Sequence, residues 1–326
     1  MSRFTTWCAP ALIVILTLAA SGFAQDKKMK NSDIENIGSR DINKGTINFV
    51  SIDKEIALGR QLSLQVEQES RLLKDPIISE YVNRIGQNIV RNSDARVPFT
   101  IKVIESDQVN AFALPGGFFY VNTGLILAAD DEAELAGAMA HEIAHVAARH
   151  GTEQESKAQL VSYMVLPLMF VAGPVGYGVE QAASIFVPFT FLKFSRGMEA
   201  EADYLGVQYL YKSGYDPGAM VRFFEKLQVK ERAKPGSVSR LFASHPPTGD
   251  RIRKVEEAIT VVLPPRDRDV ESTSEFEHVK AYLAKIESVY LPDNAGQPSL
   301  RHKTPAPDPD NEPPETPDDR PTVKRN

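Results

Sequence analysis

The sequence predicts a mainly helical α+β fold with a small antiparallel sheet. Apolar residues recur at three- and four-residue steps in several segments of the 326-residue chain, as on one face of a helix. Two runs rich in aromatic and β-branched residues, 99–104 and 118–121, predict strands, and the tight turns that flank the second run favour a hairpin. Residues 292–326 are dense in Pro, Asp and Glu with hardly any apolar residue, which predicts a disordered tail.

Two helices are expected ahead of the first strand. Residues 31–92 have helical periodicity, and Pro76 marks the start of the second helix because proline is favoured at a first helical position. The strand at 99–104 follows them. The strand at 118–121 comes directly after a Pro-Gly-Gly turn at 115–117. We therefore expect two packed helices, followed along the chain by a small sheet.

The helix with the clearest ends is expected over residues 132–150. Asp131 is an N-cap with the capping-box acid Glu134 three residues on, and Gly151 is the expected C-cap. Its apolar residues recur at three- and four-residue steps and predict a buried stripe: Leu135, Ala138, Met139, Ile143 and Val146. Further helices are expected over 195–213 and near the C-terminus, over 253–262 and 274–289.

The first residues have the pattern of a secretory signal. Arg3 precedes an apolar run at 9–20, and a small-residue stretch ends at Ala24, where cleavage is expected. Because Cys8 is the only cysteine, the mature chain would contain none and would need no disulfide. The alternative is an uncleaved anchor, although the run is short for a membrane span. The sequence therefore predicts transport across the inner membrane to the periplasm or cell envelope.

Within the helix over 132–150, His141, Glu142 and His145 form the pattern HExxH. Histidines four residues apart share one helix face, so His141 and His145 can bind one zinc ion while Glu142 acts as a general base on water. The alternative is a core helix with two hydrogen-bonded histidines. The pattern favours a zinc hydrolase with one zinc per chain, which points to a metalloprotease.

A catalytic zinc usually has three protein ligands, and the best third candidate is Glu199 in the next helix. Glu199 and Glu201 are separated by roughly 200° around a helix, so they cannot both face one metal. Asp203 shares the face of Glu199 and can accept the other N–H of a ligating histidine, which leaves Glu201 for solvent or a basic neighbour. The alternative is an exposed acidic first turn favoured by the helix dipole.

Four ordered motifs give the chain a resemblance to a known family. They are NAFALPGG at 110–117, HEIAH at 141–145, SRGMEAEAD at 195–203 and SHPPTGDRI at 244–252. In these motifs the chain resembles the HtpX and CaaX-prenyl-protease type of gluzincin zinc metallopeptidases, within it the periplasmic BepA-like and Oma-like branch. The resemblance implies a zincin-like metalloprotease domain with the sheet next to the HExxH helix, and Glu199 as the third zinc ligand.

Two more residues are candidates for the site. The prolines after His245 fix it on an extended loop, where it can donate to the oxyanion of the attacked carbonyl or bind zinc as a fourth ligand. The resemblance associates this histidine with a resting, plugged site. Asn110 is equally compatible with a substrate contact and with a turn residue that satisfies its own backbone. His150 lies about 500° beyond His145 around a continuous helix, off the ligand face, and is expected to be a cap residue.

The apolar segment 160–194 is broken by proline and glycine, and Glu180 and Gln181 divide it. We expect it to form helices and a loop that cover the active site; the alternative is a hairpin in peripheral contact with a membrane. The net charge of −6 gives no reason to expect a nucleic-acid partner.

The predicted organisation is a signal peptide (1–24), an N-terminal helical segment (25–75), a zinc metallopeptidase domain (76–265), a linker with a C-terminal helix (266–291) and the tail. The predicted function is hydrolysis of peptide bonds in misfolded or misassembled proteins of the cell envelope, a role in protein quality control whose substrate class comes from the resemblance. The alternative is a chaperone-like binding protein whose site is self-plugged. Unlike BepA-like relatives, the chain has no predicted helical repeat array, so the resemblance does not carry their partners over.

Overall fold

A computed structural model of the chain describes residues 32–160, 194–233, 245–246 and 248–290. The expected signal peptide, most of the apolar segment 160–194 and the expected tail lie outside the described residues. The chain forms two compact units, Met1–Lys285 and Ile286–Asn326, and the elements that build the candidate site belong to the first. Among the helices of the described residues, none combines the length and the hydropathy needed to cross a membrane.

The two expected N-terminal helices are present as α2 (Ile52–Glu69) and α3 (Pro76–Arg91). Asp75 caps α3 by accepting a hydrogen bond from the backbone N–H of Ile78, and Pro76 stands at the first helical position as predicted. The apolar stripe of α3 is buried and faces the centre of the fold: Ile78, Tyr81, Val82, Ile85 and Ile89. Burial of this stripe stabilises the helix far more than its propensity does.

The sheet has three strands, β1 (Thr100–Ile104), β2 (Ala111–Leu114) and β3 (Phe118–Asn122), in the order β1-β3-β2. The predicted hairpin is β2–β3, closed by the short 3-10 helix η1 (Pro115–Gly117). The expectation of a purely antiparallel sheet is wrong, because β1 pairs with β3 in parallel. After β1 the chain crosses to the opposite edge of the sheet, where it forms β2. The hairpin turn then brings β3 between β2 and β1, parallel to β1.

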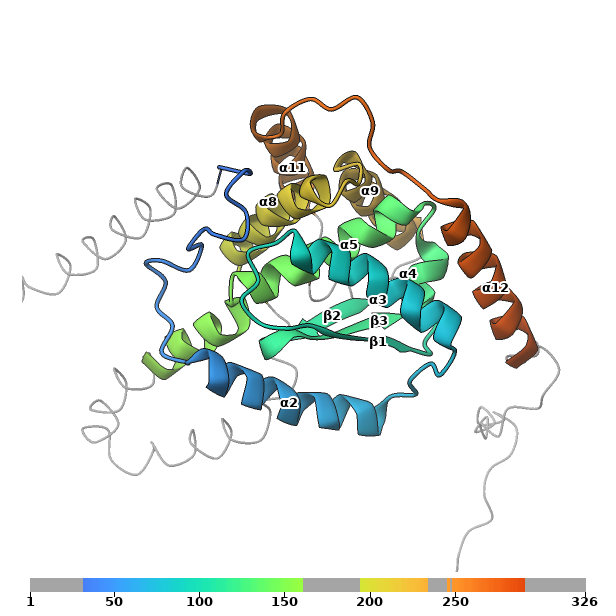
Figure 1. Ribbon diagram of the computed structural model, residues 1–326, viewed down its shortest axis with the longest axis horizontal. Helices are drawn as coiled ribbons and strands as arrows, with labels where there is room; N and C mark the ends of the chain where they lie inside the picture. The colour runs from blue at the N-terminus through green and yellow to red at the C-terminus, as the bar shows by residue number, and fades with distance from the viewer. Residues whose placement is uncertain (1–31, 161–193, 234–244, 247, 291–326) are drawn as a thin grey trace, which may run out of the picture. The chain divides into compact units, whose positions relative to one another are not determined.

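The sheet lies between helices: α3 and α5 (Glu132–Ala147) cover one face, and α2 runs across the other (Figure 1). On the α2 face, the hydroxyl of Tyr120 donates a hydrogen bond to Glu67 at 2.9 Å. The contact of α2 with η1 is so close that a Cβ on Gly59 would lie 1.8 Å from the carbonyl oxygen of Pro115. Gly59 is therefore required by this packing rather than by its backbone conformation.

Every residue of α5 is buried, and the helix begins as predicted with Asp131 accepting a hydrogen bond from the backbone N–H of Glu134. The predicted C-terminus is wrong: α5 ends at Ala147, Arg149 has a φ of 57°, and residues 150–160 form a new helix that includes Gly151. A left-handed backbone is uncommon for arginine. The Arg149 side chain stabilises it by donating 2.6 Å hydrogen bonds to Glu55 and to the carbonyl of Val50.

Five more helices complete the described part of the fold. The predicted helices are present as α8 (Arg196–Lys212), α11 (Gly249–Val262) and α12 (Ser274–Tyr290). Two further helices, α4 (Thr123–Ala128) and α9 (Gly218–Ala233), were not predicted. α4 is only six residues long, too short for a periodic pattern. Two of these helices, α8 and α9, pack against α5 and bury it in the core.

Candidate metal centre

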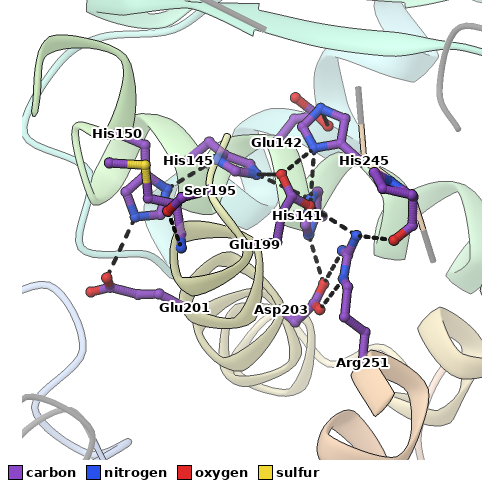
Figure 2. Close-up of polar contacts among 12 residues, drawn as sticks. His141, Glu142, His145, His150, Ser195, Glu199, Glu201, Asp203, His245 and Arg251 are labelled. Atoms are coloured by element: carbon purple, nitrogen blue, oxygen red, sulfur yellow. Dashed lines mark hydrogen bonds and ion pairs between the residues drawn. The ribbon is translucent and has the colours of Figure 1, made fainter. Parts of the chain in front are cut away.

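The structure brings three elements together around the buried helix α5. His141, Glu142 and His145 come from α5, Glu199 from the first turn of α8, and His245 from the loop before α11 (Figure 2). Each is 2–4% exposed, so water does not compete for their polar atoms. Ser195 places Glu199 by capping α8, since its hydroxyl accepts a hydrogen bond from the backbone N–H of Met198.

His141, His145, Glu199 and His245 form what we call the His/Glu cluster, in which one ligand atom from each lies within 4.8 Å of every other. The Nε2 atoms of His141 and His145 are 3.1 Å apart, and Nδ1 of His245 is 3.4 Å from Nε2 of His141. The Glu199 carboxylate lies 3.5 Å from His141 and 3.6 Å from His145. Tetrahedral bonds of about 2.0–2.2 Å separate ligand atoms by about 3.3–3.6 Å, so several of these distances are close to those of a zinc site.

His245 occupies the fourth corner of the cluster. Its Nδ1 lies 2.8 Å from Glu199 Oε1, and its Nε2 lies 3.5 Å from Glu142 Oε1. Four protein ligands are typical of closed zinc sites, whereas a catalytic site leaves the fourth position to water or substrate. With His245 included, the cluster offers four protein ligand atoms.

Asp203 and Arg251 form a second layer on one side of α8. Asp203 Oδ1 lies 3.0 Å from Nδ1 of His141, the ring nitrogen that points away from the cluster. Arg251 donates two hydrogen bonds of 2.7 Å to Asp203 and one of 3.1 Å to the carbonyl of Pro246, and it lies 2.9 Å from Glu199. Arg251 was not predicted as a site residue. Its one sequence signal is its place in the segment SHPPTGDRI, six residues after His245.

His150 and Glu201 lie on the opposite side of α8 (Figure 2). His150 is fully buried, its Nδ1 lies 2.9 Å from Nδ1 of His145, and its Nε2 lies 3.5 Å from Glu201. The expectation that His150 is merely a cap residue away from the site is wrong. That expectation assumed one continuous helix to residue 150. The helix instead breaks at Arg149, and the new helix begins with His150 next to His145.

Burial and neighbouring charges set the ionisation of the cluster. Burial raises the pKa of Glu142, which favours its role as a proton acceptor, and the charges of His245 and His141 partly oppose this. Burial and the adjacent His141, His150 and His245 lower the pKa of His145 well below its ordinary value, so its imidazole is neutral, as a metal ligand requires. Burial lowers the pKa of His141, but Asp203 and Glu199 outweigh it and raise that pKa to about 9.

The other predicted candidate, Asn110, does not join the cluster. It precedes β2, where its backbone carbonyl accepts a hydrogen bond from Asn122, and its side chain is 8% exposed. Its side-chain oxygen has no hydrogen-bond partner within the described part of the chain.

Sequence reasoning also missed Phe194, whose ring stacks on His145 with 4.1 Å between centroids and 23° between planes.

A comparison with protein families finds a match over the region that contains the cluster. The profile of Peptidase family M48 matches residues 76–259. Over 213 residues the chain is 35% identical to the beta-barrel assembly-enhancing protease of Yersinia pestis, covering 62% of this chain and 43% of the relative. Over 250 residues it is 30% identical to the protein of that name from Escherichia coli K12, covering 74% and 49% respectively. The chain thus spans about half the length of these relatives.

A eukaryotic relative is similar over a comparable stretch. The chain is 32% identical over 220 residues to the mitochondrial metalloendopeptidase OMA1 of Schizosaccharomyces pombe, which covers 66% of this chain and 64% of the relative. The matched stretches are long enough to include the whole distance from His141 to Glu199 and His245.

Proposed function

The chain belongs to peptidase family M48, and from that premise we propose that it is a zinc metalloendopeptidase. The observation that carries the proposal is the His/Glu cluster: four buried side chains whose ligand atoms lie within 4.8 Å of one another, of the residue types that bind zinc, with Glu142 beside them. His141, His145 and Glu199 are the proposed ligands of the active site. When bound, zinc supplies a Lewis acid that lowers the pKa of water towards neutrality and polarises a carbonyl group.

Glu142 is the proposed general base. Its carboxylate takes a proton from the attacking water and later delivers it to the leaving amine, which requires a pKa closer to neutral than that of an exposed glutamate. Burial raises the pKa of Glu142 in that direction. The only cysteine of the chain, Cys8, lies in the predicted signal peptide, so a cysteine nucleophile in the mature chain has no support.

The substrate backbone is proposed to lie along β2. The central strand β3 pairs on both sides and has no free edge. β2 is one of the two edge strands, and no further strand of the described residues pairs with it. A hydrogen bond from the backbone N–H of Ala113 on β2 favours the charged form of Glu142, which supports a substrate position next to the proposed base. Asn110, with its unpaired buried oxygen, can accept a hydrogen bond from a substrate N–H there.

Protein substrates in a misfolded or misassembled state remain the proposed substrate class, and the cell envelope the proposed location. The signal-like residues 1–24 support the location, and so does the name of the bacterial relatives, which refers to beta-barrel assembly. An edge strand binds a substrate through hydrogen bonds to the substrate's backbone, so binding depends little on the substrate's sequence. Such a strand suits unfolded chains of many sequences.

The test compares wild type with Glu142→Gln. Purified wild type is expected to bind about one zinc and to cleave unfolded casein, and Glu142→Gln is expected to keep the metal and lose cleavage by at least about 10²-fold. Glu225→Gln, an exposed glutamate on α9, is the matched control and should cleave like wild type. Cleavage that persists in Glu142→Gln contradicts the assignment of the base.

A second candidate function is a binding protein with conditional or no proteolysis, favoured by the position of His245 at the fourth corner of the cluster. For cleavage, His245 has to leave so that water and the substrate carbonyl can enter. Cleavage by His245→Ala but not by wild type would show that the closed state limits activity. If both bind casein and zinc but neither cleaves, the binding function is favoured instead.

A further inference from the structure

Both histidines of the HExxH pattern point the same ring nitrogen at the centre of the cluster. Their Nε2 atoms are 3.1 Å apart, so their Nδ1 atoms point outward, towards different neighbours. A histidine that binds a metal through Nε2 carries a proton on Nδ1, and this N–H is normally donated to a neighbouring acceptor that fixes the ring. For His141 the nearest acceptor on this side is the Asp203 carboxylate, whose Oδ1 lies 3.0 Å from Nδ1.

For His145 the outward neighbour is a third imidazole. Nδ1 of His145 and Nδ1 of the fully buried His150 are 2.9 Å apart. Two lone pairs, or two N–H groups, would repel each other at this distance, so one proton lies between the nitrogens. If His145 binds zinc through Nε2, the proton belongs to His145 and His150 accepts it.

That assignment determines the other nitrogen of His150. A neutral imidazole that accepts at Nδ1 carries its proton on Nε2, and this N–H faces the Glu201 carboxylate at 3.5 Å. Glu201 is two residues from Glu199 and therefore on another side of α8, which excludes it from the cluster but brings it to His150. The ring of His145 is also fixed in plane by the stacked ring of Phe194.

We propose that His150 is a positioning residue of the zinc site: it fixes the tautomer and ring orientation of His145, and Glu201 fixes the tautomer of His150. The inference rests on the proposed zinc function. The two ligand histidines are then held differently, His141 by a carboxylate directly and His145 by a carboxylate acting through a second imidazole. A histidine that only fills space in the core would need neither a particular tautomer nor an acid at its far nitrogen.

Zinc affinity, measured by competition with a chelator, separates positioning from packing. His150→Leu keeps the volume but removes the acceptor, and it is expected to weaken zinc binding by about 10–100-fold. His150→Asn places a side-chain oxygen near the position of Nδ1 and is expected to stay within about threefold of wild type. His278→Leu, at an exposed position on α12, is the control and should bind like wild type.

The tautomers can be read directly in the wild-type chain, which avoids any variant that fails to fold. With only six histidines, selectively labelled protein gives few signals in long-range proton–nitrogen NMR. In the zinc-loaded chain His145 is expected to be protonated on Nδ1 and His150 on Nε2. A His150 protonated on Nδ1, or an affinity of His150→Leu within twofold of wild type, would overturn the proposal. Failure of wild type to bind zinc would instead refute the proposed function.

Discussion

Replacing Arg251 by methionine removes a buried cation from between two carboxylates. Arg251 is 7% exposed, donates two 2.7 Å hydrogen bonds to Asp203 and lies 2.9 Å from Glu199. Burial lowers the pKa of Arg251, but Asp203 outweighs this and raises it, so the guanidinium is charged. Methionine fills a similar volume but removes the cation that lies between the two acids. Breaking a buried pair from one side costs about 3–5 kcal/mol, so we expect that loss of stability.

The assay is thermal unfolding followed by circular dichroism, with chelator present so that zinc does not contribute. A loss of about 3 kcal/mol or more lowers the midpoint by at least about 6 °C in a unit of this size. The matched control is Arg253→Met on the same helix, whose partner Asp250 is 56% exposed and whose own side chain is 65% exposed. Its midpoint should stay within about 2 °C of wild type. Equal midpoints for the two variants would refute the assignment of Arg251 as the residue that stabilises these acids.

Three further outcomes are expected in unfolding experiments. Gly59→Ala places a Cβ 1.8 Å from the carbonyl oxygen of Pro115 and should cost about 1–3 kcal/mol, whereas Gly249→Ala, whose Cβ meets nothing within 4 Å, should be nearly neutral. Tyr81→Phe removes a hydrogen bond to buried Glu132 and should cost about 1.5–3 kcal/mol, more than Tyr282→Phe at an exposed site. Zinc at 100 times its Kd should stabilise wild type by about 2.7 kcal/mol, and chelation should reverse the gain.

The helices and strands that were predicted correctly are those whose signals are local. Asp75 with Pro76, and Asp131 with Glu134, mark helix starts by hydrogen bonds that span only three residues. The end of α5 was predicted wrongly because its cause is not local. Arg149 is held in its left-handed conformation by Glu55, 94 residues earlier, and no rule of helix capping contains that contact.

The residues of the site also fall into those that local patterns predicted and those whose positions depend on distant contacts. Helix periodicity predicts that His141 and His145 lie together and that Glu199 and Glu201 cannot both face them, while Asp203 favours Glu199. In the structure His141, His145 and Glu199 lie close together. His150 and Arg251 could not be placed by periodicity. His150 depends on the break at Arg149, and Arg251 reaches Asp203, 48 residues away, through the packing of α11 on α8.

The groups that orient the proposed ligands and the group that closes the site belong to different parts of the fold. Asp203 and Glu201 are on α8 and Arg251 is on α11, whereas His245 is on the preceding loop. Arg251 connects the two parts through one hydrogen bond to the carbonyl of Pro246, 3.1 Å long, beside its two shorter bonds to Asp203.

A hydrogen bond to a neutral carbonyl contributes about 0.5–1.5 kcal/mol, whereas breaking the buried Arg251–Asp203 pair costs about 3–5 kcal/mol. In the proposed opening of the site, we therefore expect the weaker connection to be the one that breaks. Asp203 keeps its arginine, and His141 keeps the carboxylate behind its Nδ1. We expect the proposed opening to leave the groups that hold His141 in place, so that the proposed ligands keep their positions when water enters at the fourth position.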